Sequence, residues 1–188
     1  MSVIIILAAL FQIISSKDRK SLKRYIEKFR IGDDGENLFI EKLSVKLDDG
    51  YVYISKYPMN SGGDIDGILI SKKGIIVLEI KNWRGKFAVY HRKIFKNFFH
   101  KLQRYSDAFE QVENNRTELE RLIKGYKIRP WLGFGPRTNY NIKENPGVFV
   151  VNWDNIAEHV FSLKDILEPG EVENVVDILT SSTKIKPI

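Results

Sequence analysis

The chain has 188 residues, of which 43% are hydrophobic and 29% charged, the composition of a folded protein large enough to bury a core of its own. It contains no cysteine, which excludes disulfides, thiol nucleophiles and cysteine-ligated zinc and fits a reducing compartment. Neither a P-loop nor a dinucleotide-binding glycine pattern occurs, so nothing supports nucleotide-cofactor chemistry. The net charge of +6 is concentrated in two basic blocks, residues 17–30 and 91–104, which predicts a polyanionic partner, either nucleic acid or an anionic membrane surface.

Residues 1–16 form an apolar segment without a charged side chain, and the first basic block follows it directly. As a helix, this segment would span about 24 Å, less than the roughly 30 Å hydrocarbon core of a bilayer. Two interpretations stay open. The segment is either a membrane anchor, with residues 1–24 contacting the membrane and the body of the protein cytoplasmic, or a helix that packs on the domain or on a partner. Residues 17–30 are predicted to be a basic helical linker.

A helix is predicted to begin at Asp33 or Asp34, each a suitable N-cap, and to bury one apolar side. It places Glu36 in its first turn, where a carboxylate complements the helix dipole. A strand is expected over residues 51–57, and the loop that follows it ends in two glycines.

Residues 64–83 predict a β-hairpin whose charged positions require an explanation, because apolar β-branched residues otherwise dominate both strands. Successive side chains of a strand alternate between its faces, so Glu79 and Lys81 point the same way. Pairing of the two strands would bring Asp66 close to them, and the two carboxylates could then hold a hard cation beside a lysine. The alternative is an ion pair on a solvated strand face, which contributes little.

A third strand over residues 86–90 precedes the second basic block, in which five Lys or Arg residues alternate with three phenylalanines and no acid occurs. This is the composition of a nucleic-acid-binding groove, where cations neutralise phosphates and rings stack on bases. The same stretch suits a helix that packs an apolar stripe and leaves its basic residues outside, and we expect both to hold. The candidate nucleic-acid-binding residues are Lys93, Lys96, Lys101 and Arg104.

The remaining chain is predicted to hold a long helix, a buried strand and two closing helices. The long helix runs from about residue 106 to residue 124, and the stretch that follows it lacks periodicity and is expected to be a long loop. A near-continuous apolar run then suits a central strand of the sheet. These expectations cover residues 125–146 for the loop, 147–152 for the strand, 162–167 and 171–180 for the closing helices, and 183–188 for a polar tail.

The spacing of Asp66 from Glu79 and Lys81 resembles the Asp…Glu-x-Lys signature of the PD-(D/E)XK nucleases, and more narrowly the nuclease-related domain (NERD) family. Five matches occur in order and span roughly residues 31–170. They are Gly35-Glu36 at a helix start, Ile65-Asp66, residues 74–83 with Gly85, Gln111 on a later helix, and the strand at 147–152. The resemblance implies an α/β, restriction-endonuclease-like fold with a central mixed β-sheet flanked by helices, in a domain over residues 31–182.

The resemblance also implies a Mg²⁺-dependent (or Mn²⁺-dependent) nuclease, with DNA as the expected partner. Asp66 and Glu79 are then the metal ligands, assisted by the carbonyl of Ile80. Lys81 orients or deprotonates the attacking water, or stabilises the developing negative charge. Glu36 is expected near the metal, where it would hold a second ion or a water.

Alternatives remain at three levels. Asp64 shares a strand face with Asp66 and is a reserve candidate for its role. The glutamine of the family follows an Asn-Pro pair by three residues, where this chain has Asp107-Ala108, so Gln111 is either an active-site residue or a surface glutamine. For the whole chain, the alternative is an inactive module of the same fold that binds nucleic acid or associates with a membrane.

Overall fold

A computed structural model of the chain describes residues 35–47, 50–98, 101–142 and 147–181, without the side chains at positions 97, 98, 101, 102 and 142. The chain divides after Asp34, and all of these residues belong to the second unit, Gly35–Ile188. The expectations for residues 1–16, 17–30 and 183–188 therefore lie outside the described residues. None of the helices in the described ranges is long and apolar enough to cross a bilayer.

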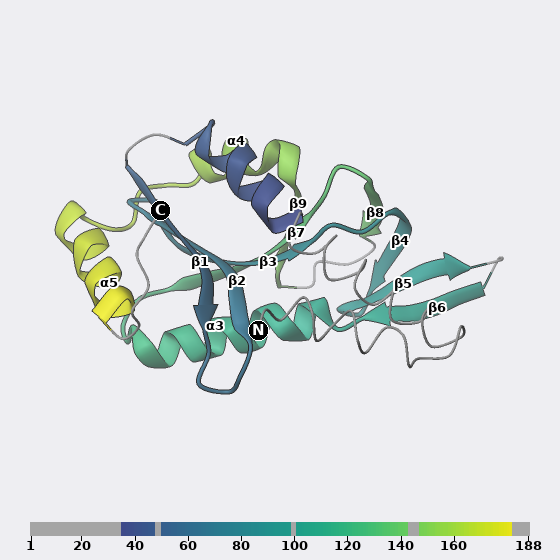
Figure 1. Ribbon diagram of the computed structural model, residues 1–188, viewed down its shortest axis with the longest axis horizontal. Coiled ribbons are helices and arrows are strands. Elements are labelled where there is room, and N and C mark those ends of the chain that lie inside the picture. Colours follow the sequence, from purple (N-terminus) through teal and green to yellow (C-terminus); the bar gives the residue numbers. More distant parts are fainter. Residues whose placement is uncertain (1–34, 48–49, 99–100, 143–146, 182–188) are drawn as a thin grey trace, which may run out of the picture. The chain divides into compact units, whose positions relative to one another are not determined.

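The main sheet has five strands in the order β1-β2-β3-β7-β9 and is mixed (Figure 1). The first three strands form an antiparallel meander, whereas β3, β7 and β9 run parallel to one another. The strands are β1 (Tyr51–Pro58), β2 (Asp64–Ser71), β3 (Gly74–Lys81), β7 (Ile128–Phe134) and β9 (Phe149–Asn152).

A second sheet of four strands, in the order β6-β5-β4-β8, begins where the first sheet ends. Strand β4 follows β3 and strand β8 follows β7 after short connections, and β4 pairs with β8 in parallel as β3 does with β7. The strands are β4 (Gly85–Tyr90), β5 (Lys93–Phe98), β6 (Lys101–Ser106) and β8 (Thr138–Ile142).

Helices cover both faces of the main sheet, which explains why β3 is apolar along almost its whole length. The helix of residues 35–44 and α4 lie on one face, and α3 runs along the other (Figure 1). Alternate β3 side chains enter two separate core clusters, one packed on α3 and α5, the other on the helix of residues 35–44 and α4. The remaining helical bounds are α3 (Ala108–Leu122), a 3₁₀ turn (Trp153–Asn155), α4 (Ile156–Phe161) and α5 (Pro169–Ser181). The predicted α/β, restriction-endonuclease-like fold is confirmed.

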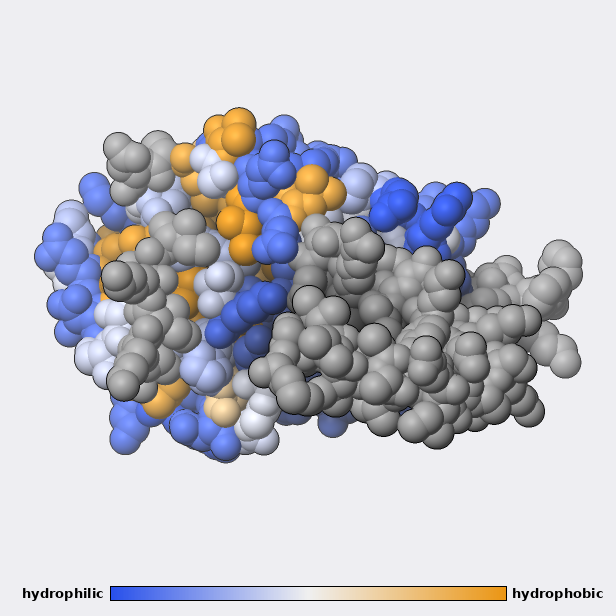
Figure 2. Space-filling view, viewed as in Figure 1, coloured by the Kyte–Doolittle hydropathy of each residue, from blue (hydrophilic) through white to orange (hydrophobic). Residues whose placement is uncertain are grey.

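The space-filling view shows apolar patches among polar residues over the region of the helix of residues 35–44 and α4 (Figure 2). Leu38, Val45 and Phe161 are among the large apolar side chains that stay exposed. Scattered apolar side chains of this kind are ordinary on folded proteins and by themselves indicate no partner.

The prediction of a helix over the second basic block is wrong, because this stretch forms the hairpin of β5 and β6. His91 and Arg92 have φ angles of 45° and 58°, and they make the two-residue turn between β4 and β5. Left-handed backbone at both central positions matches the twist of antiparallel strands. Because neither residue is Gly or Asn, the usual sequence signal of such a turn is missing.

The predicted loop at residues 125–146 is also wrong, since β7 and β8 lie within it. Strand β7, not β9, is the interior parallel strand, and β9 is at the sheet edge. Pro130 interrupts the pattern of β7 but is tolerated, because pairing with β9 begins only at Trp131↔Phe149. At this proline β7 is therefore paired only with β3, through Val77.

Of the two closing helices, the second is present as α5, but residues 162–167 are not helical. The backbone N–H groups of Ile166 and Leu167 both donate to the carbonyl of Lys72 in the β2–β3 turn. The helix in this region lies earlier, as α4. Contacts with a distant turn thus replace local helical hydrogen bonds.

Gly67 on β2 tests the packing beside Asp66. A Cβ at this position would overlap the hydroxyl of Tyr53 and lie 2.6 Å from its Cζ atom, and Tyr53 is buried. We expect Gly67→Ala to lower the free energy of unfolding by about 1–3 kcal/mol, because the ring must shift within a packed core. Gly170→Ala is the matched control, since a Cβ there meets open space in the first turn of α5 and should stabilise slightly. Equal melting temperatures for the two variants would contradict this packing argument.

Candidate active site

The acidic candidates meet where strands β2 and β3 separate. The register between them ends at Gly67↔Leu78. One residue beyond this pair, Asp66 Oδ2 accepts a hydrogen bond of 2.7 Å from the backbone N–H of Ile80. The carboxylate thus supplies an acceptor to β3 where its pairing with β2 has stopped, and this hydrogen bond fixes Asp66 beside the end of β3.

Glu79 has a carboxylate side chain, yet it is only 4% exposed, because it lies on β3, the middle strand of the main sheet. Its Oε1 atom forms an ion pair with Lys81 Nζ, two residues along the same strand face. Its Oε2 atom accepts a hydrogen bond of 3.3 Å from Asn115 Nδ2 on α3. Both oxygens of this buried carboxylate therefore have partners, as a buried charge requires.

The first turn of the helix of residues 35–44 approaches the end of β3 through Asn82. A Cβ on Gly35 would lie 2.6 Å from Asn82 Cβ, and one on Gly135 would lie 2.6 Å from Asn82 Oδ1. Asn82 is thus wedged between two glycines. This close approach brings Glu36 to the site, where its Oε2 atom lies 3.6 Å from Lys56 Nζ on β1.

Burial dominates the electrostatics of the site. It raises the pKa of Glu79 to about 7, an effect that the charge of Asp66 reinforces and Lys81 opposes. Burial also raises the pKa of Asp66, against the opposing effects of Lys81 and of the Ile80 N–H group. For Lys81, burial acts to lower the pKa, but the carboxylates of Glu79 and Asp66 outweigh it and the pKa is raised. Lys81 is therefore a cation at neutral pH, held against two acids.

The donor set suits a hard divalent cation. Asp66, Glu79 and Glu36 bring three carboxylates to a poorly solvated site that contains two lysines, Lys81 and Lys56. In the described ranges, no three His, Cys, Asp or Glu side chains already form a ligand cluster. Mg²⁺ needs only one or two carboxylates, because it keeps several of its waters. Asp66 and Glu79 are the residues that would hold it.

Gln111 does not make the contact that its match suggests. Its side chain is exposed on α3, and the amide that bonds Glu79 belongs to Asn115, one helical turn later. Asn115 is buried between Val112 and Leu119 in the apolar stripe of α3. A polar residue at a core position of the stripe is the signal that sequence reasoning missed. The reserve candidate, Asp64, is exposed at the start of β2.

The basic candidates lie on the β5–β6 hairpin and have different surroundings. Lys93 is exposed, and Arg104 forms an ion pair with Asp107. Lys96 Nζ lies 5.2 Å from the ring centroid of Phe87 and 5.0 Å from that of Tyr105. The side chain of Lys101 lies outside the described residues.

Trp83 connects this basic sheet to the end of β3. It follows Lys81 by two residues and packs against Phe87, Tyr105 and Phe134, with ring centroids 4.9–5.5 Å apart. The aromatic cluster lies partly in the core and partly at the surface, since Tyr105 is 41% exposed.

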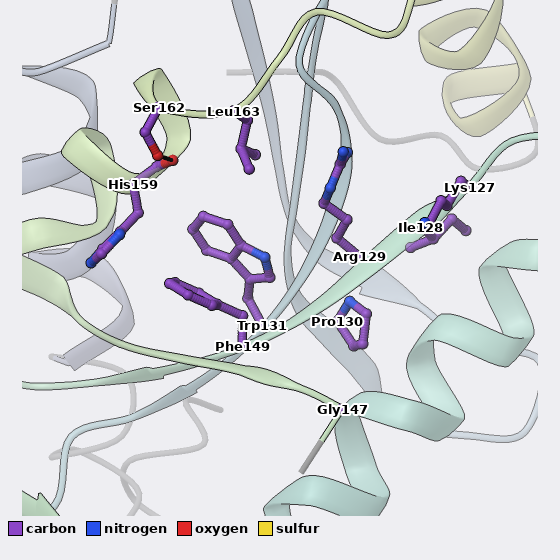
Figure 3. A pocket seen from close by; sticks show the side chains of 10 residues that line it. All are labelled: Lys127, Ile128, Arg129, Pro130, Trp131, Gly147, Phe149, His159, Ser162 and Leu163. Atoms are coloured by element: carbon purple, nitrogen blue, oxygen red, sulfur yellow. Dashed lines mark hydrogen bonds between the residues drawn. The ribbon is translucent and has the colours of Figure 1, made fainter. Parts of the chain in front are cut away.

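A separate cavity of about 380 Å³ lies between β7, β9 and α4 (Figure 3). Its aromatic wall consists of Trp131, Phe149 and His159, in which the Phe149 ring contacts both others. Trp131 belongs to the core cluster on the face of the sheet opposite α3. No carboxylate is among the ten lining residues, so this cavity is not part of the acidic site.

The mixed sheet carries acids on the neighbouring strands β2 and β3, and a lysine lies two residues after the acid of β3, which is the arrangement expected from the resemblance to nuclease-related α/β domains. A family model described as the nuclease-related domain, NERD, matches residues 31–135, which is more than half of the chain. The chain therefore belongs to the NERD family, and its function is nuclease-related. No curated protein and no solved structure compared with the chain gives a match.

Glu79 is expected to make the stability of the metal-free protein fall with rising pH. Its pKa in the folded state, about 7, lies above its ordinary value of 4.5, so the folded chain binds the proton more tightly. The stabilising contribution is complete below about pH 4.5 and is lost as the pH rises through about 7. Melting temperatures measured in EDTA should therefore decrease between about pH 5.5 and pH 8, and Glu79→Gln should reduce that slope. Parallel profiles of parent and variant would assign the pH dependence to other groups.

Asn115 and Gln111 provide a matched pair on one helix. Asn115→Ala removes a hydrogen bond from a buried carboxylate and should lower the free energy of unfolding by about 1–3 kcal/mol. Gln111→Ala changes an exposed side chain and should stay within about 0.5 kcal/mol of the parent. Urea unfolding of both variants at pH 8 measures the difference. If Gln111→Ala lowered the free energy of unfolding more than Asn115→Ala, Gln111 and not Asn115 would be the helix residue that supports the site.

Proposed function

We propose that this protein is a Mg²⁺-dependent nuclease that hydrolyses phosphodiester bonds of DNA. The observation that carries the proposal is the convergence of Asp66 and Glu79, from neighbouring strands, with Lys81 paired to Glu79 at the same place. Membership of a nuclease-related family supports the reaction class. Mn²⁺ is the expected substitute metal, because it accepts the same oxygen ligands.

The chain's own residues have distinct roles in this reaction. When bound, Mg²⁺ would neutralise charge on the scissile phosphate and lower the pKa of a bound water. Asp66 is oriented for metal binding by the Ile80 N–H group and Glu79 by Asn115. The raised pKa of Lys81, in which two carboxylates outweigh the opposing effect of burial, keeps it protonated at neutral pH. It would therefore donate hydrogen bonds to the attacking water or to phosphate oxygens rather than remove a proton.

The second sheet supports a polyanionic substrate. Only three residues separate the end of β3 from its first strand, β4, so the second sheet follows the acidic site directly along the chain. Lys93 and Arg104 are exposed there, and Tyr105 offers a partly exposed ring beside Lys96. Lysine and arginine neutralise backbone phosphates, and an exposed ring stacks on bases of any sequence.

The catalytic prediction concerns Asp66 and Lys81. We expect Asp66→Ala and Lys81→Ala each to lower Mg²⁺-dependent nicking of a plasmid by about 100-fold or more, because one removes a metal ligand and the other a charge-stabilising donor. Both variants should still bind DNA. Asp165→Ala is the control, since Asp165 is an acid on the surface that pairs with Lys73.

Metal binding is measured separately from cleavage, through the melting temperature. Mg²⁺ or Mn²⁺ should raise the melting temperature of the parent protein and of Asp165→Ala but not that of Asp66→Ala, because a ligand that binds only the folded state stabilises it. Salt-sensitive DNA binding with no cleavage under either ion would establish instead an inactive nucleic-acid-binding module.

A further inference from the structure

The cavity between β7, β9 and α4 has an aromatic side and a cationic side (Figure 3). Trp131, Phe149 and His159 gather on one side, and the Phe149 ring contacts both of the others. Arg129 lies on the other side, and Lys127 lies beyond it. The volume of about 380 Å³ falls within the roughly 300–1,000 Å³ of small-molecule sites. The cavity therefore suits a ligand with a planar ring at one end and a negative charge at the other.

Trp131 brings to this cavity a polar group that still needs an acceptor. The residue is only 3% exposed, and its indole N–H group donates no hydrogen bond to any residue that the structure describes. Figure 3 shows the indole nitrogen on the side of the ring that faces Arg129. Indole N–H groups in protein interiors usually have a hydrogen-bond partner. An acceptor atom of a bound ligand would supply that partner from the cavity.

Arg129 is held in position by the β2–β3 turn. Its Nη1 atom donates a hydrogen bond of 2.9 Å to the carbonyl of Lys73, and a Cβ on Gly74 would lie 2.6 Å from the same atom. A guanidinium has several further N–H donors, and no carboxylate in the described part of the chain forms an ion pair with Arg129. The ten residues that line the cavity include no acid. The charge of this wall is therefore positive, and its fixed guanidinium is available to an anion.

Phe149 makes the aromatic side of the cavity accessible from solvent. It lies on the edge strand β9 and is 41% exposed. A single exposed ring is ordinary, but this one borders a cavity that also holds an indole N–H group and a guanidinium. Nucleic-acid bases stack on exposed aromatic rings, and guanidinium groups bind phosphate through charge-assisted hydrogen bonds. A nucleotide combines both of these groups with ring atoms that accept hydrogen bonds.

We propose that this cavity is a nucleotide-binding site, in which a base stacks on the Phe149 ring, the Trp131 N–H group donates to a ligand acceptor, and Arg129 binds the phosphate. Trp131 packs on the face of the main sheet opposite α3, whereas Glu79 is bonded from α3, so this site is separate from the acidic one. The inference goes beyond the proposed cleavage and does not depend on it. The occupant is either a free mononucleotide or one nucleotide of a strand, which share the same chemistry.

The test measures binding to the full chain by isothermal titration calorimetry in EDTA, so that no metal ion enters the acidic site. Adenosine monophosphate is the probe, because a purine offers a large face for stacking and the phosphate carries the charge. Adenosine and inorganic phosphate separate the contributions of the ring and of the charge. A short oligodeoxyadenylate distinguishes a nucleotide within a strand from a free one.

Adenosine monophosphate should bind the parent protein, and adenosine and phosphate should each bind at least about tenfold more weakly. Phe149→Ala should weaken binding of the nucleotide by about tenfold, because it removes the stacking ring. Arg129→Gln should also weaken it by about tenfold, because it removes a charge-assisted hydrogen bond. Trp131→Phe, which keeps a ring but removes the N–H group, should weaken it by about threefold.

Two control variants match these changes outside the cavity. Phe161→Ala removes a phenylalanine of similar exposure, 45%, which lies on α4 and does not line the cavity. Arg121→Gln makes the same change of charge at an exposed position of α3, on the other face of the main sheet. Both should bind the nucleotide like the parent.

The proposal is overturned if the parent binds neither adenosine monophosphate nor the oligonucleotide, or if Phe149→Ala and Arg129→Gln bind them as the parent does. The two variants lie on different strands, so either one decides the question if melting curves show that the other does not fold. Tighter binding of the oligonucleotide, with the same loss in Phe149→Ala, identifies the occupant as a nucleotide within a strand. If Phe149→Ala weakens only the binding of adenosine monophosphate, the occupant is a free nucleotide.

Discussion

The buried carboxylate of Glu79 is the feature on which the rest of the site depends. A charge on a strand covered by helices on both faces is costly unless every oxygen has a partner. Lys81 supplies one partner because it lies two residues along the same strand face, and Asn115 supplies the other from α3. The alternation of side chains along β3 must therefore place Lys81, and the packing of α3 must place Asn115, so that both reach the same carboxylate. The excess negative charge around it is what a divalent cation would neutralise.

The fold creates this situation by ending one sheet and beginning another. Pairing of β2 with β3 ends at Gly67↔Leu78, and β4 starts a new sheet soon after Lys81. In the interval β3 has no strand partner on the β2 side, although it stays paired with β7 as far as Lys81↔Phe134, and the Asp66 carboxylate accepts the Ile80 N–H group on that open side. Backbone polar groups that leave a ladder within a protein must find other partners. The same interval leaves room for acids to come together.

Local patterns predicted the hairpin and the positions of its acids. The alternation of side chains along each strand and the turn at residues 71–74 both depend on residues that are adjacent in the sequence. Strand β7 could not be found in this way, since its parallel partner β3 is some fifty residues away and Pro130 hides its pattern. The His91–Arg92 turn lacks the residues that mark such turns. Asn115 was missed because a polar residue in an apolar stripe gains its meaning only from a distant carboxylate.

Asn82 gives the site a rigid spacer. Its side chain touches the positions of Gly35 and Gly135 so closely that neither could carry a Cβ without a shift. Close-packed atoms yield far less than ion pairs between long side chains, whose geometry changes with protonation. The separation between the first turn of the helix of residues 35–44 and the end of β3 is therefore set by steric contact and not by charge. The acidic groups would keep their spacing whether or not a ligand is bound, so little reorganisation would accompany its arrival.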